Sequence, residues 1–239
     1  IGVCNGFAIP VAQKLGAKEY SALRRFVANA TWLCLAFSVV MTVIVSILCG
    51  DILRFMKTPE DIFSYTYWYM LIIFLGIPCT FLYNILAALI RSLGDSKTPV
   101  IFLALASVMN AGLDVLLVAV FRWGVVGAGV ATVMAEGISA LLCAWHIYRR
   151  IPLLHLARRE LKIDRRLLRE TVSSGAITAM QQACQPIGKA LIQSVMNAQG
   201  VSVIAAFNAV SRVDDFACIP EQSISSGMMT CIAHNRGAG

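Results

Sequence analysis

The stretch PVIFLALASVMNAGLDVLLVAVF, residues 99–121, holds one charged side chain, Asp114, among twenty-three residues. A helix of about 20 apolar residues spans the hydrocarbon core of a bilayer, so this stretch predicts a membrane-spanning helix. A carboxylate at membrane depth is by default a candidate functional group. Asn110 precedes Asp114 by one helical turn and shares its face of the helix.

Five further apolar runs repeat this pattern along the chain. The composition, 58% hydrophobic and 14% charged residues, lies outside that of soluble domains, which are about 25% charged. The sequence therefore predicts an all-α, polytopic membrane protein and not a soluble helical domain. The predicted spans are residues 26–49, 62–90, 99–121, 123–147, 171–199 and 201–233, and residues 1–13 form a shorter uncharged run.

Basic residues are unevenly divided between the loops that join these spans. Fifteen Lys and Arg residues fall in alternate loops that include residues 14–25, 91–98 and 149–169, against three in the loops between them. The positive-inside rule places the basic loops in the cytoplasm, and residues 50–61 and 122–123 outside. The net charge of +7 is then explained by anionic lipid. No nucleic-acid partner is expected, because residues 149–169 lack interleaved aromatic side chains.

Several function classes find no support in the residues. The eight cysteines are scattered through apolar runs without a CxxC pair, and no histidine lies deep in a span, which indicates packing residues and not a metal centre. Phosphate-binding, hydrolase and dinucleotide motifs are absent from the sequence. An intramembrane enzyme would need a catalytic pair, such as two facing aspartates, whereas Asp114 is isolated. We expect neither an enzyme nor a cofactor.

Three polar side chains are expected at one depth in the membrane. At about 1.5 Å per residue, Asp114 lies roughly 10 Å and Asn110 roughly 16 Å from the end of their helix at Phe121. The next run returns through the membrane, which puts Thr132 roughly 14 Å below the same end. A carboxylate, an amide and a hydroxyl at one depth predict a site for a small cation or a proton. The alternative is that Asp114 only bonds neighbouring helices.

An internal repeat relates the two ends of the chain. Four small residues recur after 221 positions, and each set closes an apolar run before a cytoplasmic loop. Six spans separate the copies, so both point the same way, which indicates a parallel repeat about an axis along the membrane normal. The pairs are Gly6 and Gly227, Ala12 and Ala233, Gly16 and Gly237, and Ala17 and Ala238.

These features resemble the MATE (multidrug and toxic compound extrusion) family. The resemblance is carried by the motifs QKLGA (13–17), RSLGDSKTP (91–99), Asn110-x3-Asp114, the glycine series from Gly124 to Thr132, Arg212-x-Asp214 with Pro220, and the terminal Gly237-Ala238-Gly239. It implies a twelve-helix transporter of two six-helix lobes, a 6+6 parallel repeat. Such transporters export organic cations and drugs across the bacterial plasma membrane in exchange for Na⁺ or H⁺.

The resemblance also implies a division of the chain. Residues 1–148 correspond to the N-lobe, from the end of the family's second helix through its sixth. Residues 149–169 form a basic cytoplasmic connector between lobes, either amphipathic along the interface or a solvated linker. Residues 170–239 begin the C-lobe with helices seven and eight. The chain therefore looks like a fragment, with the rest of its own lobes outside it.

Asn110, Asp114 and Thr132 match three members of the family's N-lobe cation site, which would hold Na⁺ in a sodium-coupled protein. The seventh helix offers glutamines and a lysine where some relatives carry an acidic residue, and this favours the N-lobe site. Glu136 either lines the substrate cavity or makes a structural hydrogen bond. Arg212 with Asp214 or Asp215 predicts a structural ion pair, with a gate as the alternative. The remaining candidates for the cavity are Gln181, Gln182 and Gln185, which could instead join packed helices.

The runner-up function is a lipid-linked oligosaccharide flippase of related architecture. Its cavity would be richer in arginine, which would hold a pyrophosphate. The identity of the substrate, the choice between Na⁺ and H⁺, and the oligomeric state stay open at the level of the sequence.

Overall fold

The computed structural model describes residues 2–55, 60–154, 164–197 and 201–238, and all of its regular elements are helical. Residues 155–163 of the predicted connector lie outside the described part. The helices are α1 (Gly2–Gly16), α2 (Tyr20–Phe55), α3 (Glu60–Ser92), α4 (Lys97–Asp114), the π-helix η1 (Val115–Val120), α5 (Gly124–Arg150), the short 3₁₀ helix η2 (Pro152–Leu154), α6 (Arg165–Asn197) and α7 (Val201–Ala238).

Each predicted span falls within or closely matches a helix, which confirms the all-α membrane fold. Four helices are long and apolar enough to cross a membrane, namely those at 20–54, 62–92, 97–120 and 124–150. Within the described residues, α6 and α7 do not reach this hydropathy. The physical reason is their polar content, which includes four glutamines and Lys189 on α6 and Arg212 with two aspartates on α7.

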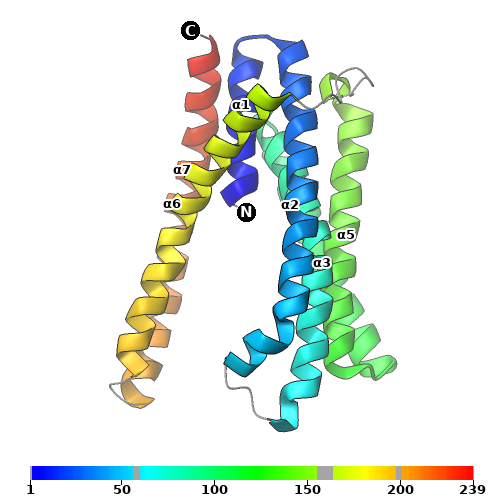
Figure 1. Cartoon of the computed structure of the whole chain (residues 1–239), viewed down its shortest axis with the longest axis vertical. Coiled ribbons are helices and arrows are strands. Elements are labelled where there is room, and N and C mark those ends of the chain that lie inside the picture. The colour runs from blue at the N-terminus through cyan, green and yellow to red at the C-terminus, as the bar shows by residue number, and fades with distance from the viewer. Residues whose placement is uncertain (1, 56–59, 155–163, 198–200, 239) are drawn as a thin grey trace.

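The helices form two groups that diverge from a shared end (Figure 1). α2, α3, α4 and α5 pack side by side, whereas α6 and α7 pair with each other and lean away. α1 contacts both groups, because its apolar faces meet α2 and α3 on one side and α6 and α7 on the other. Large buried side chains from α1, α2 and α3 fill the centre of this junction, among them Phe7, Leu23, Phe26, Ile85 and Leu89.

α1 and α7 touch through backbone atoms at two equivalent points. A Cβ added at Gly16 would overlap the carbonyl oxygen of His234, and one added at Gly237 would overlap that of Gln13. His234 stands 221 positions after Gln13, and Gly237 stands 221 positions after Gly16, so the two pairs occupy equivalent positions in the repeat. The two contacts are therefore one contact made twice, as a parallel repeat about a pseudo-two-fold axis requires.

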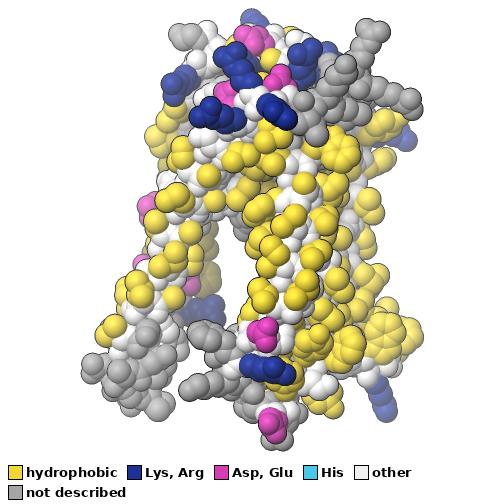
Figure 2. Space-filling model, viewed as in Figure 1, with side chains coloured by type: hydrophobic (Ala, Val, Ile, Leu, Met, Phe, Trp, Pro, Cys, Tyr) yellow, Lys and Arg dark blue, Asp and Glu magenta, His cyan; other side chains and the backbone are white. Residues whose placement is uncertain are grey.

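The surface divides by charge along the length of the helices (Figure 2). Lysine and arginine side chains gather at the shared end, and apolar side chains cover the body of the helices below. The space-filling view is hollowed between the two groups, and the hollow opens at the end away from the basic residues. This distribution agrees with the predicted cytoplasmic position of the shared end.

Candidate functional site

The predicted cation site begins where α4 and α5 pack as antiparallel neighbours. Small residues on α5 make the approach close, since a Cβ at Gly127 would lie 3.2 Å from the backbone of Leu117 in η1, which continues α4. One turn further along α5, the Thr132 hydroxyl accepts a hydrogen bond from the Asn110 amide at 3.4 Å and donates to the Ala128 carbonyl at 3.0 Å. The structure thus brings Asn110 and Thr132 together at one depth.

Asp114 lies one turn beyond Asn110 on the same helix, half-buried. Its Oδ1 is buried and has no hydrogen-bond partner among the described residues. A buried polar atom without a partner calls for an explanation, and an unseen ion, proton or water is among the usual ones. The helix changes type directly after it, from α4 to the π-helix η1. Isolated π turns inside helices occur frequently at functional sites.

Together the three side chains offer oxygen atoms of three kinds. A carboxylate, an amide and a hydroxyl are the hard ligands that small hard cations prefer. The described residues include no group of three His, Cys, Asp or Glu side chains that could hold a metal ion. A single carboxylate supplemented by neutral oxygens fits a monovalent cation or a proton better than a transition metal.

Glu136 lies one turn from Thr132 on α5 but faces α3. It accepts a hydrogen bond from the Thr80 hydroxyl, which lies one turn beyond Gly76. A Cβ at Gly76 would overlap the side chain of Val133, so the two helices are in close contact at this point. This contact corresponds to the structural hydrogen bond that the sequence left open for Glu136. Thr80 was not predicted, although a hydroxyl one turn after a glycine in an apolar run was a usable signal.

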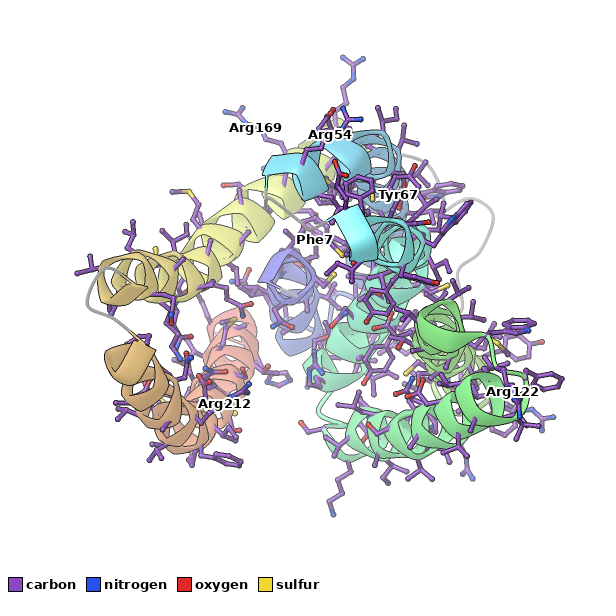
Figure 3. All side chains as sticks on the ribbon, turned by 90° about the horizontal axis from the view of Figure 1, so that it is seen from below. Phe7, Arg54, Tyr67, Arg122, Arg169 and Arg212 are labelled. Atoms are coloured by element: carbon purple, nitrogen blue, oxygen red, sulfur yellow. The ribbon has the colours of Figure 1, made fainter. Side chains whose placement is uncertain are left out.

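The predicted ion pair on α7 is not the one that the structure forms. Asp214 Oδ2 lies 3.5 Å from the Lys189 ammonium of α6, and Asp215 Oδ1 also bonds to Lys189. Arg212, labelled beside α7 in Figure 3, has no ion pair within the described part of the chain. The reason is geometric, because the antiparallel pairing of α6 and α7 sets Lys189 opposite the two aspartates.

Two of the predicted glutamines of α6 lie in helix contacts as well. The Gln222 amide of α7 donates to Gln185 Oε1 at 3.5 Å. Gln182 Oε1 lies 3.1 Å from the position that a Cβ on Gly2 of α1 would take. Gln181 is exposed on α6. A role for these side chains in a substrate cavity stays a prediction.

A polar network that the sequence did not identify closes the opposite end of α4. Asp95 accepts backbone hydrogen bonds from Lys97 and Thr98, at 3.1 and 3.0 Å, and a third from the Thr98 hydroxyl. His146 Nε2 of α5 lies 3.7 Å from the same carboxylate. Partial burial raises the pKa of Asp95, but the hydrogen bonds and His146 outweigh it and hold this pKa below its ordinary value.

A cavity of about 840 Å³ lies beside this network and away from Asp114. Its lining mixes aromatic, basic and aliphatic side chains from the ends of α1, α4 and α5. They include Leu15, Phe102, Trp145, His146 and Arg149. The guanidinium of Arg149 lies 5.7 Å from the centre of the Trp145 ring, as in a cation–π contact.

Comparisons with known proteins support one family. The MatE family model matches residues 1–116. Two proteins of Bacillus subtilis are similar over the whole chain: the probable multidrug resistance protein YoeA, 30% identical over 245 residues, and YpnP, 28% identical over 239. Each alignment covers 100% of this chain and 53% of the relative, so the chain spans about half the length of the curated relatives it matches.

The fold is similar to solved structures as well. A crystal structure of MATE in the bent conformation superposes with a TM-score of 0.93 at 19% sequence identity. The superposition covers 99% of this chain and 53% of that one. At this identity the likeness shows the fold alone, and it confirms the predicted architecture.

Proposed function

Because the chain belongs to the MATE family, we propose that the protein is a secondary active antiporter that exports organic cations and drugs in exchange for Na⁺ or H⁺. Its place is the plasma membrane of a bacterial cell, since both relatives named above are bacterial and four helices have the length and hydropathy of spans. The partners are the lipid bilayer and a small organic cation.

One observation supports the coupling site above all others. Asp114 Oδ1 is buried and has no partner in the described part of the chain, one helical turn from Asn110, which is hydrogen-bonded to Thr132. An isolated carboxylate in an apolar helix bundle is costly when charged, so it favours an added proton or metal cation. Binding of either changes the local charge by one unit, which biases a two-state arrangement of helices.

The hollow between the two helix groups leaves room for the helices to move when the charge at Asp114 changes. Cation binding at Asp114 alters the packing of α4 on α5, within the group that flanks the hollow. Substrate and coupling ion each bind the outward-open and inward-open arrangements with different affinity. Each therefore shifts the population toward the arrangement that it binds more tightly. Export results when the gradient of the coupling ion favours the arrangement that releases substrate outside.

Transport by the purified full-length protein in proteoliposomes tests this function. A fluorescent organic cation is loaded inside or outside, and sodium and proton gradients are imposed separately. We expect one of the two gradients to drive counter-movement of the dye. A protein that moves no organic cation under either gradient would refute the antiporter assignment.

A further inference from the structure

The cavity of about 840 Å³ at the ends of α1, α4 and α5 is separate from the proposed coupling site. Its described lining does not include Asn110, Asp114 or Thr132. Its volume lies within the range of about 300–1,000 Å³ that is usual for small-molecule sites. The cavity belongs to the end of the helices where lysine and arginine side chains gather (Figure 2). A ligand held there would lie at the predicted cytoplasmic surface of the membrane.

The polar side of the cavity carries two arginines that no carboxylate neutralises. Arg149 and Arg150 lie in the last turn of α5, both are exposed, and neither makes an ion pair in the described part of the chain. Asp95 also lines the cavity, but its carboxylate accepts three hydrogen bonds at the start of α4. The two guanidinium groups are therefore available to a bound anion, and their paired N–H groups match the oxygens of a phosphate.

The other side of the cavity is apolar and continues toward the membrane core. Phe102 of α4 and Trp145 of α5 contribute aromatic rings to the lining. Trp145 is 57% exposed and Tyr148 is 70% exposed, and such side chains are enriched where a membrane meets water. Leu141, which is 67% exposed, precedes Trp145 by one turn on the same face of α5. An exposed apolar track therefore leads from the cavity into the bilayer.

A ligand that suits both sides of the cavity has an anionic head and an apolar tail. We propose that the cavity binds an anionic phospholipid of the cytoplasmic leaflet, with its phosphate at Arg149 and Arg150 and its acyl chains along Trp145 and Leu141. Basic pockets between membrane helices on the cytoplasmic side suit such headgroups. Free phosphate would leave the apolar wall uncovered, and a zwitterionic lipid would bring no net charge to the arginines. The site goes beyond the proposed antiporter function and does not depend on it.

Titration of the delipidated full-length protein with phosphatidylglycerol in a neutral detergent tests the site. We expect tighter binding than that of phosphatidylcholine. Arg149→Gln and Arg150→Gln should each raise the dissociation constant of phosphatidylglycerol about tenfold, because each removes a charge-assisted hydrogen bond. Arg169→Gln, at an exposed arginine of α6 labelled in Figure 3, is the matched control and should bind as the wild type does. An equal loss in this control would show that the lipid responds to net charge alone and would overturn the proposal.

Fluorescence of Trp145 tests the position of the lipid without changing either arginine. Every other tryptophan of the full-length protein is replaced by phenylalanine, including Trp32, Trp68 and Trp123. Bromine atoms on an acyl chain quench an indole ring that they contact. Brominated phosphatidylglycerol should quench Trp145 more strongly than brominated phosphatidylcholine at the same mole fraction, and unlabelled phosphatidylglycerol should remove the difference. Equal quenching by the two brominated lipids would overturn the proposal.

Inorganic phosphate distinguishes a lipid site from a site for the free anion. We expect phosphate, compared with chloride at the same ionic strength, to leave the quenching by brominated phosphatidylglycerol unchanged, because it cannot cover the apolar wall. Phosphate that displaces the lipid as effectively as unlabelled phosphatidylglycerol would show that the cavity selects the free anion, and the lipid assignment would then be wrong.

Discussion

The amide of Asn110 donates to the hydroxyl of Thr132 across the interface of α4 and α5, at 3.4 Å. The two residues are twenty-two positions apart in the chain, and the Thr132 hydroxyl passes the bond on to Ala128. This link fixes two neutral oxygens one helical turn from Asp114, whose Oδ1 has no partner among the described residues, and the first two predictions follow from it.

Asp114→Asn should abolish gradient-driven export in the full-length protein while leaving folding and insertion largely intact. The substitution keeps the volume and hydrogen-bonding ability of the side chain but removes its charge. Asp51→Asn, at an exposed site on α2, is the matched control and should transport as the wild type does. Proteoliposome export and thermal unfolding in detergent measure the two effects. Wild-type export with the same ion dependence would show that Asp114 is structural.

Asn110→Ala and Thr132→Ala should each raise the concentration of coupling ion needed for half-maximal export, without eliminating transport. Interhelical hydrogen bonds in membranes contribute about 0.6 kcal/mol on average, so unfolding should change little. The two residues share one bond, and the double variant should therefore lose less than the sum of the single losses. Strictly additive shifts in ion dependence would mean that the pair does not act as a unit.

Gly76→Ala should destabilise the protein by about 1–3 kcal/mol, the usual cost of overpacking. The added Cβ would overlap the side chain of Val133, which is β-branched and has little rotamer freedom in a helix. Val133→Ala in the same protein should recover part of the loss. Gly50→Ala on α2 is the control, because nothing lies within 4 Å of its added Cβ. Equal unfolding temperatures for the two alanine variants would contradict the close α3–α5 contact.

Asp95→Ala should cost about 1 kcal/mol at neutral pH, as the loss of a side-chain cap usually does. The pKa of Asp95 is lower in the folded protein than its ordinary value, so its stabilising effect is complete above that value. The effect is lost as the pH falls through the folded pKa, and the variant and wild type should then converge. Chemical unfolding across an acid titration measures this. A difference that persists at the lowest pH would exclude the charge as its cause.

The sidedness of the loops is testable with single cysteines in a protein cleared of its native eight. Trp123→Cys should react with a membrane-impermeant thiol reagent in sealed cells, because its loop is predicted to lie outside. Ser96→Cys should react only after the cells are opened. Both native side chains are exposed, so access by the reagent is equal apart from the membrane. Labelling of position 96 from outside would show that the true topology is the reverse of the predicted one.

The apolar runs and the charge pattern predicted the helices because a bilayer restricts both the length and the composition of the helices that span it. The same rise per residue predicted that Asn110 and Thr132 share one depth, since depth depends on position along a helix alone. Which neighbour a side chain meets also depends on how each helix is rotated, and single-helix spacing does not contain that information. For this reason the sequence did not predict the contact between Thr80 and Glu136. It also did not predict that Asp214 pairs with Lys189 and not with Arg212.

The reciprocal contacts of α1 and α7 resemble the isologous interface of a homodimer, except that both copies of the contact lie within one chain. In a homodimer a single substitution alters both copies of a contact, whereas here Gly16 and Gly237 mutate independently. The atoms that approach each glycine are main-chain carbonyls, of Gln13 and His234, so the side chains at those positions are not constrained by the contact. The side chains on the two helices are therefore free to diverge in chemistry while the backbone contact between α1 and α7 stays the same.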